Sequence, residues 1–241
     1  SFGDQPLFDD IGFNIHSGER IGLVGRNGSG KTTLFKLITG EMSPDDGHIA
    51  LPKNYTVGYL KQHLTFTEPT VLLEACLGLR SGEEDQIWKA EKILSGLGFT
   101  TDEMDKSPLE FSGGFQVRLN LAKVLLTEPH LLLLDEPTNY LDIISIRWLT
   151  KFLKNWKNEL MIITHDRDFM NSVTTHTIGI HRRKIKKIEG DTIKLFEQIA
   201  TEEEVYEKTR LREDKKRDDA MEFINRFRAQ AARASLVQSR I

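Results

Sequence analysis

The sequence has 241 residues, of which 39% are hydrophobic and 29% charged, with a formal net charge of −3 and a pI near 6.2. These values suit one large domain and exclude a globally basic nucleic-acid-binding chain. A single cysteine, Cys76, excludes an internal disulfide, and no apolar run approaches the roughly 18–20 residues that span a bilayer. We therefore expect a cytoplasmic protein. The first residue is Ser1 rather than Met, which predicts that the sequence is part of a longer chain.

The first half of the chain predicts strands that alternate with helices. Residues 11–15 (IGFNI) alternate apolar and polar side chains, and the run IGLVG at 21–25 is typical of a short buried strand. A helix is expected from about Lys31. Residues 47–60 predict further strands, and residues 70–98 predict helical structure.

The second half continues this alternation. A helix follows Gly114, and the leucine run HLLLLDEP at 130–137 predicts a parallel strand that is buried on both faces. LMIITHD at 160–166 predicts a second buried strand. Between these strands, apolar residues recur every four positions and predict one amphipathic helix: Ile144, Trp148, Phe152 and Trp156. This order of elements predicts an α/β fold with a parallel sheet.

The composition changes near residue 201, after which charged residues dominate and neither Gly nor Pro occurs. We expect a globular domain over residues 1–200 and a charged helix or helical hairpin over 201–241. No acidic residue follows Glu222, but four arginines do: Arg226, Arg228, Arg233 and Arg240. Such a segment can be a solvated spacer or a surface that binds nucleic-acid phosphates.

A phosphate-binding loop is indicated by GRNGSGKT at residues 25–32, which fits G-x-x-x-x-G-K-[ST] between a strand and a helix. Glycines let successive backbone N–H groups surround a phosphate. Lys31 would supply a cation to the β- and γ-phosphates, and the Thr32 hydroxyl can bind Mg²⁺. The nucleotide-binding residues expected here are Gly25, Asn27, Gly28, Ser29, Gly30, Lys31, Thr32 and Thr33.

Two adjacent carboxylates, Asp135 and Glu136, follow the leucine run, at the end of a strand where ligands of open α/β sheets bind. Neighbouring side chains at a strand end point in different directions, so the two can have separate roles. With the phosphate loop nearby, Asp135 would complete the Mg²⁺ shell and Glu136 would act as general base toward the attacking water. Without that loop, a solvated acidic pair would explain them equally well.

A second anion-binding turn is indicated at residues 109–126, where Ser112, Gly113 and Gly114 stand directly before an apolar helical pattern. Glycine and serine in front of a helix can present backbone N–H groups to a phosphate. The next residue, Phe115, has no obvious role in reading phosphate.

These motifs occur in the order that is typical of ABC-type ATPases, and residues 1 to about 195 resemble that family. GRNGSGKT resembles the Walker A loop, LLLLDEP the Walker B strand and FSGGFQ the signature motif. YLKQ with Gln62 resembles the Q-loop, NYLD with Asp142 the D-loop, and ITHD with His165 the switch histidine. Phe2 stands where this family stacks an aromatic ring on adenine.

The resemblance implies a P-loop ATPase domain with a parallel-sheet core, an antiparallel β-subdomain, a small α-helical subdomain and a charged helical extension. It implies ATP and Mg²⁺ as ligands, with Gln62 near Mg²⁺ or water and His165 near the γ-phosphate. The catalytic residues that it implies are Glu136, His165, Gln62 and Lys31. Two such domains would close head to tail, so these residues would contact the ATP of the partner domain: Ser112, Gly113, Gly114 and Asp142.

Several details resemble the ABC-F subfamily and its YheS- and Uup-like members. EPTNYLD, THDRDFM and IEGDTIKLFEQ resemble stretches of ABC-F proteins, as do a bulky residue at position 115 and the charged C-terminal segment. The resemblance implies a cytoplasmic ATPase that acts on the ribosome, with the C-terminal arginines near tRNA. A nucleotide-binding subunit of a membrane transporter is the alternative. We expect no membrane as partner. A DNA-associated ABC ATPase is the least favoured class, because zinc-ligand cysteines and very long heptad arrays are missing from the sequence, so DNA is not expected either.

Overall fold

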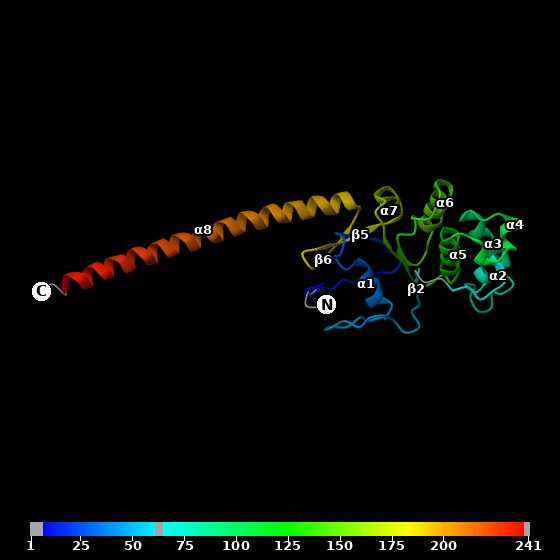
Figure 1. The fold of residues 1–241 in the computed structure, drawn as a ribbon, viewed down its shortest axis with the longest axis horizontal. Helices are drawn as coiled ribbons and strands as arrows, with labels where there is room; N and C mark the ends of the chain where they lie inside the picture. The colour runs from blue at the N-terminus through cyan, green and yellow to red at the C-terminus, as the bar shows by residue number, and fades with distance from the viewer. Residues whose placement is uncertain (1–6, 61–64, 239–241) are drawn as a thin grey trace. The chain divides into compact units, whose positions relative to one another are not determined.

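The structure is a computed structural model that describes residues 7–60 and 65–238, with side chains described up to residue 217 and at Met221 (Figure 1). The chain forms two compact units, residues 1–195 and residues 196–241. Phe2, Gln62 and Arg240 lie outside the described residues, and the side chains of Arg226, Arg228 and Arg233 are likewise not described.

A six-stranded sheet with the order β2-β3-β4-β1-β5-β6 forms the centre of the first unit. Its neighbouring strands are parallel except for β5 and β6, which are antiparallel. The phosphate-loop strand β1 lies between β4 and β5, so its carboxyl end is at the middle of the sheet. The strands are β1 (Arg20–Gly25), β2 (Val57–Tyr59), β3 (Leu131–Asp135), β4 (Glu159–Ile163), β5 (His176–His181) and β6 (Lys184–Glu189).

Helices cover both faces of this sheet, with α1 on one side and α6 and α7 on the other (Figure 1). A group of short helices and α5 completes the unit. The helices are α1 (Lys31–Ile38), α2 (Val71–Cys76), α3 (Ile87–Gly96), α4 (Thr101–Met104), the 3-10 turn η1 (Pro108–Glu110), α5 (Gly113–Leu126), α6 (Ile143–Lys154), α7 (Arg167–Val173) and α8 (Thr192–Gln238).

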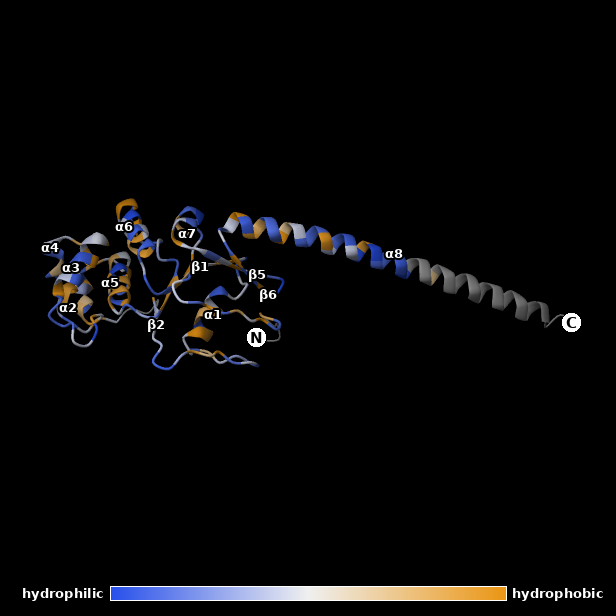
Figure 2. Cartoon of the chain, turned by 180° about the vertical axis from the view of Figure 1, so that it is seen from behind, coloured by the Kyte–Doolittle hydropathy of each residue, from blue (hydrophilic) through white to orange (hydrophobic). Residues whose placement is uncertain are grey.

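The leucine run of β3 explains how the two layers are held together. Leu131 and Leu133 pack into the core beneath α1, whereas Leu132 and Leu134 pack into the core beneath α5, α6 and α7. Successive side chains of a strand point to opposite faces, so an uninterrupted apolar run is what a strand covered on both faces requires. The prediction of a doubly buried parallel strand is confirmed, and Figure 2 shows hydrophobic residues along the central strands.

Of two regions predicted to form strands, one is not a strand in the structure and the other is a strand only at its end. Residues 11–15 and 47–56 have no assigned strand, and only Val57–Tyr59 of the 47–60 region pairs. In the second region the chain turns at Pro52, whose carbonyl accepts from Tyr55 N at 3.1 Å, and Asn54 has a φ of 62°. The backbone at this turn therefore leaves the extended conformation that a strand requires. Within the described residues, the antiparallel part of the sheet is the β5–β6 pair.

The predicted helical stretch 70–98 is broken between Cys76 and Ile87. Gly78 lies in this break, and a Cβ on it would come within 2.3 Å of the carbonyl oxygen of Lys123. The backbone therefore packs directly on α5, which a regular helix with side chains could not do. The helical structure predicted over residues 70–98 is therefore present as two helices, α2 and α3, with a break between them.

Helix α6 is present, but its buried face is one position away from the predicted stripe. Its buried residues are Ser145, Leu149 and Leu153. Ile144 of the predicted stripe is 75% exposed, and Trp148 and Phe152 are only partly buried, stacked with ring centroids 5.1 Å apart. The four-residue spacing predicted the helix correctly. Its core face was ambiguous, because Leu149 and Leu153 directly follow Trp148 and Phe152, so apolar residues lie on two neighbouring faces.

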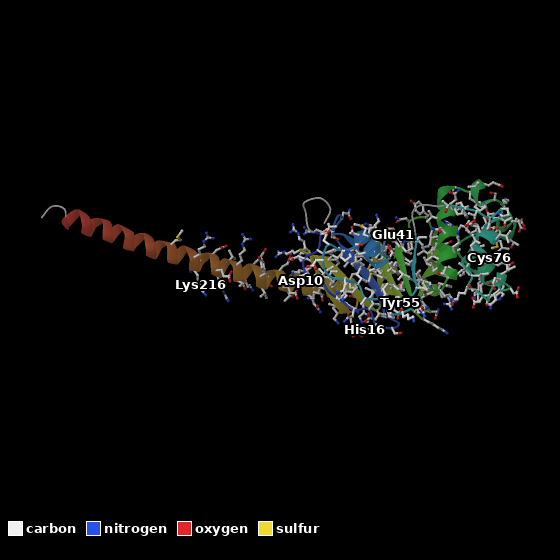
Figure 3. All side chains as sticks on the ribbon, turned by 90° about the horizontal axis from the view of Figure 1, so that it is seen from below. Asp10, His16, Glu41, Tyr55, Cys76 and Lys216 are labelled. Atoms are coloured by element: carbon white, nitrogen blue, oxygen red, sulfur yellow. The ribbon has the colours of Figure 1, made fainter. Side chains whose placement is uncertain are left out.

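The charged C-terminal segment is one helix, α8, rather than a hairpin. Its described side chains beyond residue 200 are almost all exposed and point outward on all sides (Figure 3). Lys208 with Glu204 and Arg210 with Asp214 form i,i+4 ion pairs, which support an exposed helix. Across the part of the chain that the structure describes, no helix combines the length and the apolar character needed to cross a bilayer.

Candidate nucleotide-binding site

A cleft of about 490 Å³ opens at the carboxyl ends of β1, β3 and β4. This edge of a parallel sheet is where ligands bind in open α/β folds. Most of its lining was predicted from the sequence, but Leu7 and Ile163 were not, since single apolar residues carry no motif. The lining residues are Leu7, Asn27, Gly28, Gly30, Lys31, Thr32, Thr33, Asp135, Glu136, Ile163 and His165. Gly25 and Ser29 support the loop without lining the cleft.

The loop between β1 and α1 has the geometry that its glycines predict. Gly28 and Gly30 are left-handed, with φ of 77° and 95°. A Cβ on Gly30 would lie 2.8 Å from the ring of Phe8, whereas one on Gly28 would meet nothing within 4 Å. The first turn of α1 carries no side-chain cap and no acidic residue, so its N–H groups are free of competing side-chain acceptors. This cradle fits a phosphate group.

Lys31 lies over this loop. Its Nζ donates hydrogen bonds to the carbonyl oxygens of Gly25, at 2.9 Å, and Arg26, at 3.2 Å. Within the part of the chain that the structure describes, the ammonium group is thus held at the loop by backbone acceptors rather than by a carboxylate. A cation held in this way remains available to an anionic ligand.

Thr32 and Asp135 join α1 to the end of β3. The Thr32 hydroxyl donates to Asp135 Oδ2 across 2.9 Å. Burial raises the pKa of the Asp135 carboxyl above its ordinary value, although the Thr32 hydrogen bond and the charge of Lys31 act in the opposite direction. Two hard oxygen atoms side by side fit Mg²⁺, which prefers one or two protein oxygens together with phosphate and water.

Glu136 and His165 meet at the ends of β3 and β4. Glu136 has a φ of 51°, unusual for a residue with a side chain, and its N–H donates to Ile163 O at 2.8 Å. His165 N lies 3.4 Å from Glu136 Oε2, and its Nε2 lies 3.5 Å from Oε1. A left-handed backbone at such a position is a local strain of the kind that gathers at functional sites.

The signature residues are not part of this cleft. Ser112 and Gly113 are exposed at the start of α5, where the Ser112 side chain makes no capping hydrogen bond, and a Cβ on Gly113 would meet nothing within 4 Å. The Asp142 carboxylate caps α6 instead, because its Oδ1 accepts from the N–H groups of Ile144 and Ser145. The described site residues predicted from the sequence thus lie at two separate sites. Most of the Walker A residues, the Walker B residues and His165 line the cleft, and the signature and D-loop residues lie outside it.

Phe115 points into the protein. Its ring packs against Phe99 and Phe111, with centroids 5.2 and 5.7 Å away, and the guanidinium carbon of Arg118 lies 4.6 Å from its centroid. Arg118 is a residue that the sequence reasoning missed. A lone arginine in an apolar helical pattern carries no motif, although its position after the signature was a signal.

Comparison with known proteins agrees with this geometry. A family model described as "ABC transporter" matches residues 8–139, and a second model with the same description matches residues 178–241. ATP-binding cassette sub-family F member 3 of Rattus norvegicus is 34% identical over the whole chain. The probable ATP-binding protein YheS of Escherichia coli K12 and the uncharacterized ABC transporter ATP-binding protein YfmM of Bacillus subtilis are 32% and 30% identical over 99% of it.

Solved structures share the fold. The ATP-binding subunit of an ABC transporter superposes with a TM-score of 0.70 at 22% identity, covering 83% of this chain and 89% of that one. A bacterial ABC transporter cassette, solved as a dimer, has a TM-score of 0.64 at 22% identity and covers 78% of this chain and 93% of that one. The expected ABC-type α/β fold is confirmed.

The chain belongs to the ABC family of ATP-binding proteins, and one of the relatives to which it is similar is a sub-family F member. It spans 38%, 42% and 54% of the lengths of the three curated relatives described above.

Proposed function

We propose that this chain is the ATP-binding and ATP-hydrolysing domain of an ABC-F protein that acts on the ribosome, with ATP enclosed between two paired ABC domains. The observation that carries the proposal is the convergence of Lys31, the Thr32–Asp135 pair and the Glu136–His165 pair on one cleft. A cation, a pair of hard oxygens and a carboxylate beside an imidazole are the groups that phosphoryl transfer to water requires.

The Walker A loop would hold the phosphates through the backbone N–H groups of residues 27–33, with Lys31 turning from its two carbonyl acceptors to the β- and γ-phosphates. Thr32 and Asp135, with Gln62, would hold Mg²⁺, which neutralises phosphate charge when bound. Phe2 would stack on the adenine ring. Because Asp135 is half-buried and accepts a hydrogen bond from Thr32, its carboxylate is positioned before the ligand arrives.

Glu136 would accept the proton of the attacking water, and His165 would orient the γ-phosphate. The Glu136 carboxylate is 22% exposed and the His165 ring is 75% exposed, so both can reach a ligand in the cleft. A general base needs to be within hydrogen-bond reach of the water it activates. Glu136 has a left-handed backbone, and its carboxylate lies beside the His165 imidazole.

Pairing of two domains would explain why the signature turn lies outside the cleft. Ser112, Gly113 and Gly114, with the Asp142 loop, would contact the γ-phosphate that the partner domain holds. A cassette 22% identical to this chain, with a TM-score of 0.61, has been solved in a dimeric post-hydrolysis state with ADP and Pi. We expect the isolated chain to bind ATP–Mg²⁺ but to hydrolyse it slowly until it pairs. Turnover per molecule that does not depend on protein concentration would contradict this.

The ribosomal role rests on the resemblance to subfamily F and on the arginines near the C-terminal end of the sequence: Arg226, Arg228, Arg233 and Arg240. Arginines on a helix bind RNA phosphates in a salt-dependent way. In the full-length protein, Glu136→Gln should retain ATP and hold the protein on ribosomes. Sedimentation with ribosomes in ATP, compared at low and high salt, measures this, and replacing the four arginines with glutamine should weaken it.

The alternative is the nucleotide-binding subunit of a membrane transporter, which the description of the family model and the solved neighbours favour. In that case, the Glu136→Gln protein would sediment with membranes and leave the ribosome fraction empty. Fractionation of the same lysate on a sucrose gradient therefore separates the two proposals.

A further inference from the structure

Arg118 of α5 joins three segments that are distant in the sequence. Its side chain is only 10% exposed. Its Nε donates to Tyr140 O at 2.7 Å, and its Nη1 donates to Leu97 O and to Asp142 Oδ2, each at 3.1 Å. One guanidinium group thus connects the helix of the signature motif with the end of α3 and with the loop that precedes α6.

The surroundings of this side chain fit the flat shape of a guanidinium group. One side is the Phe115 ring, 4.6 Å from the guanidinium carbon. Another side is Gly98, where a Cβ would lie 2.7 Å from Nη1, and which has a φ of 94°. Lysine offers a single point charge and cannot donate in these divergent directions from one plane. The site therefore selects arginine by geometry as well as by charge.

The two carboxylate oxygens of Asp142 accept hydrogen bonds from different elements. Oδ1 caps α6 through the N–H groups of Ile144 and Ser145, while Oδ2 accepts from Arg118. The hydrogen bond from Ser145 N, with that from Arg118, holds the pKa of Asp142 below its ordinary value. The carboxylate thus stays ionised and fixes the start of α6 to α5.

We infer that Arg118 is a positioning residue that makes the signature turn and the Asp142 loop move as one unit toward the nucleotide of the partner domain. This inference rests on the proposed function, because it concerns how the two exposed elements reach a shared phosphate. Arg118 itself is buried and touches no part of the cleft lining. Its contribution is the relative placement of Ser112 and Asp142, and a small misplacement of such groups strongly lowers turnover.

The test uses the full-length protein with Arg118→Lys, Asp142→Asn and the double variant. Asparagine at position 142 still caps a helix but lacks the charge that Arg118 requires. Arg80→Lys is the matched control, because Arg80 also donates to two carbonyl oxygens and pairs with a carboxylate, that of Glu128, away from the site. Steady-state phosphate release gives kcat, equilibrium dialysis gives the Kd for ATP, and circular dichroism shows that each variant is folded at the assay temperature.

Arg118→Lys should lower kcat about tenfold or more while the Kd for ATP changes less than about twofold. Asp142→Asn should cause a similar loss, and the double variant should lose little more than either single variant, since both break one connection. Arg80→Lys should keep wild-type kcat.

Unchanged kcat in folded Arg118→Lys, a parallel loss of ATP affinity, or fully additive losses in the double variant would overturn the inference. Each of these results leaves the proposed function intact as long as the wild-type protein hydrolyses ATP. A wild-type protein without ATP turnover would overturn the proposed function, and this inference with it.

Discussion

The imidazole of His165 lies beside the carboxylate of Glu136, with Nε2 3.5 Å from Oε1, although the two residues belong to different strand ends. The backbone N–H of His165 lies 3.4 Å from the other carboxylate oxygen. The side chain and the backbone of one residue therefore both face the proposed base. A substitution that removes the His165 ring leaves the contact of its backbone N–H with Glu136 in place. Such a variant therefore tests the role of the imidazole without removing the contact made by the backbone.

His165→Ala should lower kcat for ATP hydrolysis by about 10²-fold, because the γ-phosphate loses a positioned polar group while the base remains. The Kd for ATP should stay within about threefold, since the phosphate loop carries most of the binding. Single-turnover phosphate release measures the chemical step. His48→Ala, at an exposed position outside the cleft, is the control. Wild-type turnover in His165→Ala would remove this histidine from the mechanism.

Asp135 is expected to lower the stability of the nucleotide-free protein. Burial raises its pKa, so the folded state binds the proton more tightly than the unfolded state. The protonated Asp135 carboxyl therefore contributes stability below the unfolded pKa. This contribution is lost as the pH rises through the folded pKa and the carboxyl becomes charged. Asp135→Asn keeps an acceptor for the Thr32 hydroxyl and removes the charge, so it should raise the free energy of unfolding at neutral pH by about 1 kcal/mol.

Urea unfolding without nucleotide, repeated from acid to neutral pH, measures this effect, and the gain should shrink as the pH falls. The same variant should lose Mg²⁺-dependent turnover. A lower stability of Asp135→Asn at neutral pH would show that the Thr32 and Lys31 interactions outweigh burial.

The central strands and the phosphate loop could be predicted because each is encoded in a short continuous stretch. An apolar run such as Leu131–Leu134 needs both faces of a sheet covered, and the glycines around Lys31 need a loop with left-handed residues. Asp135 and Glu136 follow directly because they end such a strand. These local signals are sufficient to predict most of the residues that line the cleft.

Arg118 could not be predicted, because its role depends on residues 21 to 24 positions away. The strand predicted at residues 11–15 is absent for a related reason. An alternating pattern indicates which side chains are buried, but it does not show whether a neighbouring strand is present to accept the backbone hydrogen bonds. The face of α6 was uncertain because Ile144 and Ser145 begin neighbouring stripes, and only packing selects one.

Phe115 should matter for packing rather than for phosphate binding. Its ring contacts Phe99, Phe111 and the guanidinium of Arg118, and it is partly buried. Phe115→Leu should reduce the free energy of unfolding by about 1–2 kcal/mol through lost aromatic and cation–π contacts. The Kd for ATP should not change. Thermal unfolding and equilibrium dialysis measure the two quantities, and a loss of ATP affinity without a loss of stability would assign Phe115 to the nucleotide instead.

Glu74 should be the carboxylate on which the α2–α5 contact depends most. It is 0% exposed, its Oε2 accepts from the N–H groups of Thr67 and Glu68, and its Oε1 accepts from Lys123 of α5. Glu74→Gln can keep the backbone hydrogen bonds but would then turn an amide N–H₂ toward the Lys123 ammonium. Two donors facing each other in a buried site should cost about 3 kcal/mol at neutral pH.

The cost of Glu74→Gln should also depend on pH. Burial opposes ionisation, but the hydrogen bonds from Lys123, Glu68 N and Thr67 N outweigh it and hold the pKa below the ordinary 4.5. The stability from the ionised carboxylate is therefore present above the unfolded pKa and is lost as pH falls through the folded pKa. Urea unfolding at neutral and acid pH should show the difference from wild type shrinking in acid. Glu110→Gln, an exposed control, should show no such difference. An equal cost at both pH values would mean that the shape of the side chain, rather than its charge, holds α2 against α5.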